Sequence, residues 1–135
     1  MVGFYTLTVG SLDVNSVEEQ MIIKRAIVNL SYFAIDSKHQ RKGYGSLLMQ
    51  EVFNSVIVIS YDTGVEWLYL ESVDDSVEFY ESLGFEWVKP YLRPENYVGV
   101  STEKIQFPMY ISIETLLKQG YLGYVKNYKN INIEC

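Results

Sequence analysis

Hydrophobic and polar residues alternate along this chain in two patterns, one typical of strands and one typical of a helix. Residues 4–12, 26–35 and 67–73 are rich in β-branched and aromatic side chains, and the second stretch is apolar enough for the middle of a sheet. Residues 46–60 carry apolar side chains at mostly helical spacing, and Gly64 follows as a stop. The pattern therefore predicts a sheet with one amphipathic helix of about four turns.

Shorter elements complete the prediction. We expect a loop in the polar stretch 13–25, with a short helix near residues 17–22. Two acids and a serine before residues 77–83 indicate the start of a second helix. Two further strands are predicted, at 85–88 and 105–113. The order strand, strand, helix, strand, helix, strand, strand predicts an α/β or α+β fold.

Length and composition narrow the class of protein. A chain of 135 residues with 48% hydrophobic residues is expected to form one globular domain. The lone Cys135 excludes a disulfide framework and a cysteine-based zinc site, so we expect a reducing, cytoplasmic setting and no metal. No apolar run reaches the ~18–20 residues of a membrane span, and the first residues do not resemble a signal peptide. We therefore expect no association with a membrane.

The charge is acidic overall and unevenly spread. The net charge is −6, which argues against broad affinity for nucleic acid, because that affinity comes from clustered Lys and Arg. Residues 62–86 hold eight acids and no base, whereas residues 38–42 form the densest basic stretch. An anionic ligand is therefore expected near residues 38–42.

The sharpest local motif is Gln40-Arg41-Lys42-Gly43-Tyr44-Gly45, placed between the central strand and the long helix. Two glycines let a ligand approach the backbone closely, and the N–H groups at a helix start attract anions such as a diphosphate. The motif fits neither a Rossmann fingerprint nor a Walker loop. Taken alone, the motif is also compatible with an ordinary turn that carries solvated charges.

A second motif follows the next strand, Ser76-Val77-Glu78-Phe79-Tyr80-Glu81-Ser82-Leu83-Gly84-Phe85. Together the two motifs resemble motifs A and B of the GNAT superfamily of acyl-CoA-dependent N-acyltransferases, and they span about residues 26–87. The resemblance implies a mixed, mostly antiparallel central sheet with flanking helices, and acetyl-CoA as co-substrate. It places a GNAT domain at residues 1–117 and leaves residues 118–135 as a C-terminal tail.

The resemblance also assigns roles to individual residues. Family members bind the coenzyme diphosphate on the first motif, which implies contacts from Gln40, Arg41, Lys42, Gly43, Tyr44, Gly45 and Ser46. The backbone of Phe33, Ala34 and Ile35 would pair with the pantetheine arm where two strands splay apart; plain packing in the sheet is the alternative.

Two residues are candidates for the chemistry itself. Tyr80, with an ordinary pKa near ~10, would protonate the leaving thiolate, and packing on the sheet is its alternative role. Glu71 could deprotonate the amine, although the acid-rich segment also fits an exposed, solvated carboxylate.

Two departures from the family pattern matter. The family usually begins with a strand, two helices and another strand, so we expect this chain to be an N-terminally truncated member. Val73 stands where the family often has an asparagine that contacts the coenzyme. The strand at 4–12 would then lie at a sheet edge, and we expect it, or the tail at 119–135, to meet a second subunit in a homodimer. The alternative is that the tail covers this edge within the same chain.

The function expected from this resemblance is transfer of an acetyl group from acetyl-CoA to a primary amine on a small molecule, peptide or aminoacyl-tRNA. The alternative is a truncated acyl-CoA-binding or interaction module without turnover. A softer similarity over residues 3–117 is to the GNAT toxins of bacterial toxin-antitoxin pairs, which implies tRNA and an antitoxin protein as further partners.

Overall fold

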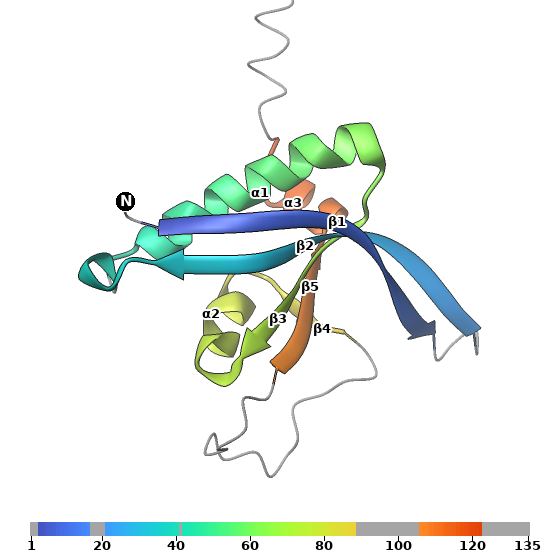
Figure 1. The fold of residues 1–135 in the computed structure, drawn as a ribbon. Coiled ribbons are helices and arrows are strands. Elements are labelled where there is room, and N and C mark those ends of the chain that lie inside the picture. The colour runs from blue at the N-terminus through green and yellow to red at the C-terminus, as the bar shows by residue number, and fades with distance from the viewer. Residues whose placement is uncertain (1–2, 17–20, 41, 89–105, 123–135) are drawn as a thin grey trace, which may run out of the picture.

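The computed structural model describes residues 3–16, 21–40, 42–88 and 106–122. Five strands form one sheet in the order β1-β2-β3-β5-β4, and three α-helices accompany it (Figure 1). In chain order the elements are β1 (Gly3–Ser16), β2 (Met21–Ile35), a 3-10 turn (Ser37–His39), α1 (Tyr44–Thr63), β3 (Trp67–Val73), a second 3-10 turn (Asp74–Ser76), α2 (Val77–Ser82), β4 (Glu86–Trp87), β5 (Gln106–Ser112) and α3 (Ile113–Lys118).

This architecture confirms the predicted class, a mixed and mostly antiparallel sheet with flanking helices. Strand β3 has the predicted bounds, and α1 extends the predicted helix at both ends. Helix α3 was not predicted, and its first residue, Ile113, was expected to end the strand at 105–113. The helices that the structure describes include none long and apolar enough to span a membrane.

The first two strands form a long antiparallel hairpin, which corrects one prediction. Backbone pairing runs from Gly3 opposite Ile35 to Ser16 opposite Met21, so Met21 and Ile22 lie in a strand and not in a short helix. The rest of that predicted helix, residues 17–20, lies outside the described residues. The segment looked loop-like because polar residues such as Asp13 face solvent, while the partner strand satisfies the backbone.

The two central strands are parallel and separate soon after they meet. Only residues 27–29 of β2 pair with residues 67–69 of β3. Beyond them β2 continues to Ile35 and β3 to Val73 without pairing to each other. The register with β1 shifts at this point, because Ser31 is an extra residue in β2, and such a bulge bends the strand that contains it. The sheet therefore opens between β2 and β3.

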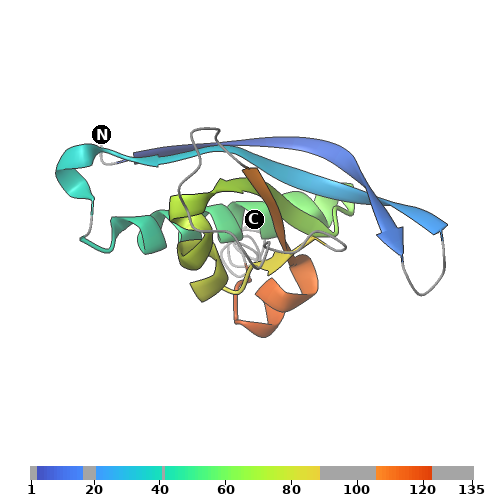
Figure 2. The same cartoon turned by 90° about the horizontal axis from the view of Figure 1, so that it is seen from below.

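All three α-helices lie on one side of the sheet, as Figure 2 shows for β1 and β2. Their apolar side chains and the alternate residues of the strands form a single core. Its largest fully buried side chains are Phe53, Phe107, Met49, Ile57, Leu68, Met109, Ile111 and Leu116. This core holds α1 and α2 against the sheet on the two sides of its opening.

Candidate functional site

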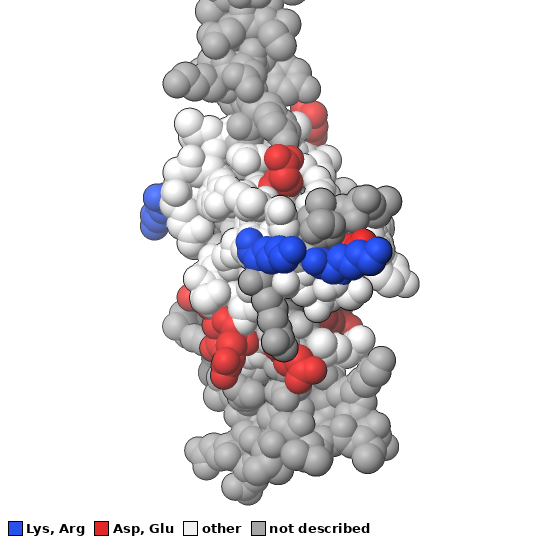
Figure 3. Space-filling view, turned by 90° about the vertical axis from the view of Figure 1, so that its left-hand side faces the viewer, with Lys and Arg blue, Asp and Glu red and all other residues white. Residues whose placement is uncertain are grey.

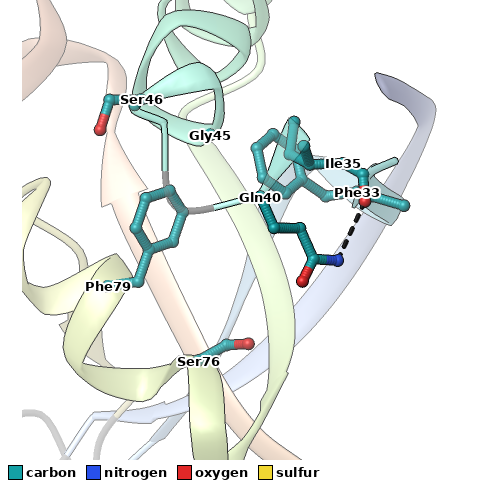
Figure 4. A pocket seen from close by; sticks show the side chains of 9 residues that line it. Phe33, Ile35, Gln40, Gly45, Ser46, Ser76 and Phe79 are labelled. Atoms are coloured by element: carbon teal, nitrogen blue, oxygen red, sulfur yellow. Dashed lines mark hydrogen bonds between the residues drawn. The ribbon is translucent and has the colours of Figure 1, made fainter. Parts of the chain in front are cut away.

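A cavity of about 660 Å³ lies where β2 and β3 separate (Figure 4). Its walls come from the end of β2, the start of α1 and the start of α2. The lining residues are Phe33, Ala34, Ile35, Gln40, Gly43, Gly45, Ser46, Ser76 and Phe79. Seven of these nine were predicted from the sequence as coenzyme contacts, and the fold brings those seven together.

The turn from β2 into α1 is held by local hydrogen bonds. Gln40 Nε2 donates to the carbonyl oxygen of Ile35 at 3.1 Å, a bond drawn in Figure 4. The backbone N–H of Lys38 donates to Asp36 Oδ1, also at 3.1 Å. Gly43 then takes a φ of +81°, a left-handed conformation that side chains rarely adopt. The glycine therefore lets the chain enter α1 directly beside the cavity.

The start of α1 is suited to an anion. The first turn of a helix presents backbone N–H groups without intrahelical acceptors, and Gly43 supplies no side-chain cap. The first turn contains no acidic residue, and the exposed side chains of Lys38 and Lys42 lie close by in sequence. Figure 3 shows basic side chains on this face of the molecule. The arrangement favours an anionic ligand.

Two aromatic side chains also line the cavity. The ring of Phe79 lies 6.1 Å from the ring of Phe33, measured between centroids. A β-carbon added to Gly45 would lie 3.4 Å from Phe79 Cζ, so any larger side chain there would displace the ring. Sequence reasoning missed Phe79 and Ser76, although Phe79 directly precedes Tyr80 in the second motif. The cavity thus combines an anion-binding end with an apolar wall.

Tyr80 is buried beside this wall. Only 9% of its surface is exposed, it belongs to the core, and it is absent from the cavity lining. Its ring meets the rings of Phe79 and Phe85 edge to face at 5.3 and 5.4 Å. Burial raises the pKa of the Tyr80 hydroxyl above its ordinary value. The hydroxyl is therefore neutral at pH 7, the state that a proton donor requires.

The other predicted residues lie outside the cavity lining. Glu71 is exposed on β3, where Tyr69 donates a hydrogen bond from its hydroxyl to Glu71 Oε1 at 3.2 Å. Lys42 is exposed, and Tyr44 lines a second cavity of about 390 Å³ between α1 and the start of β1. Arg41 lies outside the described residues.

Within the ranges that the structure describes, no group of His, Cys, Asp and Glu side chains is arranged to hold a metal ion.

Several solved structures resemble this fold. A bacterial toxin superposes with a TM-score of 0.69 at 23% identity, over 87% of this chain and 63% of the toxin. A tyrosine-to-phenylalanine variant of the toxin AtaT, bound to the C-terminus of the antitoxin AtaR, superposes with a TM-score of 0.66 at 22% identity. The match covers 89% of this chain and 64% of AtaT. AtaTR bound with acetyl-CoA superposes with a TM-score of 0.65 at 25% identity, over 87% of this chain and 65% of that chain. This chain therefore spans about two-thirds or slightly less of each of these proteins.

Sequence comparison gives the family. Curated protein sequences include no match to this chain. The sequence model of the acetyltransferase (GNAT) domain matches residues 2–87, well over half of the chain, and this range contains both motifs and the whole lining of the cavity. The chain belongs to the GNAT acetyltransferase domain family.

Proposed function

We propose that this protein is an N-acetyltransferase that transfers an acetyl group from acetyl-CoA to a primary amine. The observation that carries the proposal is the cavity between the end of β2 and the start of α2, which reaches the amino end of α1. Membership of the GNAT family and the similarity to a structure that holds acetyl-CoA support it.

The cavity offers a suitable group to each part of acetyl-CoA. The diphosphate would accept hydrogen bonds from the start of α1, with positive charge from Lys38, Lys42 and Arg41. The amides of the pantetheine arm would pair with the edge of residues 33–35, which among the described residues pair only with β1. Its methylene groups would contact Phe79. The volume of about 660 Å³ lies in the range of ~300–1,000 Å³ usual for ligand pockets.

In the proposed reaction, the amine nitrogen attacks the thioester carbonyl, so that a C–N bond forms and the C–S bond breaks. The leaving thiolate takes a proton, for which Tyr80 is our candidate donor because a tyrosine hydroxyl is protonated at neutral pH and this one lies beside Phe79 of the cavity wall. The amine loses one proton, and Glu71 is our candidate acceptor, directly or through water.

A module that binds acyl-CoA without turnover is the second candidate. One observation favours it: Tyr80 packs in the core and is absent from the cavity lining. Such a module would bind acetyl-CoA and release no free coenzyme A in the presence of any amine.

The acceptor and the protein partners belong to the proposal as well. A small amine, a peptide or an aminoacyl-tRNA would supply the nucleophile. The similar toxin AtaT is bound to an antitoxin, which makes an antitoxin protein a partner worth testing. The net charge of −6 argues against a large nucleic-acid surface, so tRNA ranks behind small amines and peptides. We also propose a homodimer, which light scattering at micromolar concentration would test.

A thiol-release assay tests this function. Purified protein and acetyl-CoA are incubated with a panel of small amines, peptides and aminoacyl-tRNAs, and free coenzyme A is measured with a thiol reagent. The proposal expects amine-dependent thiol release and an acetylated product of matching mass. Binding of acetyl-CoA without release for any acceptor would support the module, and no binding at all would refute both functions.

A further inference from the structure

Ser76 brings an unused hydroxyl to the wall of the cavity. It directly precedes α2, and it is one of three lining residues with a polar side chain, the others being Gln40 and Ser46. In Figure 4 the Ser76 side chain points from the start of α2 toward the side of the cavity that Gln40 lines. None of the nine described lining residues carries a charge. The cavity itself is therefore suited to a neutral, polar part of a ligand.

The backbone explains why this hydroxyl is free. A serine before a helix usually has an extended conformation and accepts a hydrogen bond from a backbone N–H of the first turn. Ser112 does so before α3: with φ −78° and ψ 152°, its Oγ accepts from the N–H of Thr115 at 3.0 Å. Ser76 instead has φ −106° and ψ −8°, because the 3-10 turn of residues 74–76 runs directly into α2, and its side chain makes no capping bond. No described residue forms a hydrogen bond with Ser76 Oγ.

The two other polar side chains of the lining are placed differently. Gln40 Nε2 already donates to the carbonyl oxygen of Ile35 at 3.1 Å. Ser46 lies in the first turn of α1, at the end proposed for the diphosphate. The Ser76 hydroxyl comes from the facing element and is free both to donate and to accept. It therefore suits an amide, which offers one carbonyl acceptor and one N–H donor.

We propose that Ser76 is a binding residue that holds the pantetheine arm of acetyl-CoA by a hydrogen bond to one of its amides. This inference rests on the proposed function. With the diphosphate at the start of α1, the arm would run between the end of β2 and the start of α2, because these two elements supply the rest of the lining. The backbone of residues 33–35 would contact the arm from one side and Ser76 Oγ from the other. A few polar groups placed in this way fix the orientation of a ligand in a pocket.

Two ligands separate the arm from the diphosphate. Acetyl-CoA carries both, whereas ADP carries a diphosphate and no pantetheine arm. Ser76→Ala should weaken acetyl-CoA binding about two- to tenfold, the range expected for the loss of one hydrogen bond, and leave the affinity for ADP unchanged. Gly43→Asp, at the diphosphate end, should weaken the binding of both. Calorimetry with the full chain measures these affinities.

Ser112→Ala is the matched control. Ser112 is also a half-buried serine directly before a short helix, but it caps that helix and lies outside the cavity lining. Ser112→Ala should lower the midpoint of urea unfolding, because a cap is lost, and leave acetyl-CoA affinity unchanged. Ser76→Ala should keep the midpoint of the unmodified protein, since its hydroxyl makes no bond to a described residue. The two serines thus predict opposite results in the two measurements.

Three results would overturn this inference. Equal acetyl-CoA affinities for the unmodified protein and Ser76→Ala would overturn it and leave the proposed function standing. An equal loss of affinity for acetyl-CoA and ADP in Ser76→Ala would also overturn it, because the hydroxyl would then act at the diphosphate. No binding of acetyl-CoA by the unmodified protein would overturn this inference together with the proposed function.

Discussion

At the scale of single residues, Tyr80 packs in the core and is also our candidate proton donor. Its ring lies between Phe79 and Phe85 in the core, and phenylalanine would keep that packing while removing the hydroxyl. If Tyr80 donates the proton, Tyr80→Phe should lower turnover by the ~10²–10⁴-fold typical of general acid catalysis, with little change in acetyl-CoA affinity. A thiol-release assay measures turnover, and calorimetry measures the affinity for acetyl-CoA.

Tyr121→Phe is the matched control for this experiment. Tyr121 also packs against the core, edge to face with Phe53 at 5.0 Å, but it does not line the cavity. The control should keep full turnover. If Tyr80→Phe keeps it too on a confirmed substrate, the hydroxyl has no role in the reaction and Tyr80 is a packing residue.

The raised pKa of Tyr69 predicts how the stability of the fold changes at high pH. Burial, followed by the charge of Glu71 and its hydrogen bond, raises the pKa of Tyr69 from 10.0 to about 12. The unfolded chain ionises this hydroxyl near pH 10 while the folded chain resists until about pH 12. The contribution of Tyr69 to stability is therefore complete below pH 10 and is lost as the pH rises toward 12.

Urea unfolding between pH 8 and pH 12 measures this loss. Tyr69→Phe should flatten the decline in the free energy of unfolding above pH 10, and Tyr61→Phe, at an exposed position on α1, should leave the decline unchanged. Burial also raises the pKa of Tyr80 and Tyr110, so part of the decline should persist. Identical curves for Tyr69→Phe and the unmodified protein would contradict the assignment.

At the scale of elements, the start of α1 is the part of the site most open to a controlled test. Gly43 and Gly64 flank this one helix, both have positive φ, and a β-carbon at either would meet open space. Asparagine at either position therefore carries a similar backbone cost. Only Gly43→Asn adds a side chain beside the cavity, so we expect it to weaken acetyl-CoA binding about tenfold or more, whereas Gly64→Asn should not.

Gly43→Asp separates charge from bulk at the same position. Aspartate has nearly the shape of asparagine but adds a negative charge beside the proposed diphosphate site. The Gly43→Asp variant should therefore bind acetyl-CoA more weakly than the Gly43→Asn variant. The difference should shrink as salt is raised, because salt screens exposed charges. Equal calorimetric affinities for the two folded variants and the unmodified protein would rule out this diphosphate site.

Sequence patterns predicted some elements well because their signal is local. Helical spacing located α1, and a β-rich stretch located β3. The hairpin between β1 and β2 was missed at its tip because its polar residues resemble a loop, and only pairing with the other strand makes them extended. Local sequence also does not set the rotation of α2. Packing of Tyr80 against Phe85 turns Phe79 toward the cavity.

At the scale of the whole molecule, the sheet has two unequal faces. All the described α-helices pack on one face and build the core there. On the opposite face, Trp67 stacks on Tyr110 with ring centroids 4.0 Å apart, and Arg25 lies over Trp67 and pairs with Glu66. The cavity lies beside the place where the two central strands part, and the end of β2, the turn into α1 and the start of α2 together position the site.

The central claim is that acetyl-CoA binds in this opening, with its diphosphate at the start of α1. A titration of acetyl-CoA into ¹⁵N-labelled protein, followed by amide chemical shifts, tests it most directly. We predict saturable shifts concentrated at residues 33–35 and 43–46, with the distal hairpin at residues 10–16 unchanged. Saturable shifts confined to other parts of the sheet, or no shifts at millimolar acetyl-CoA, would contradict the claim.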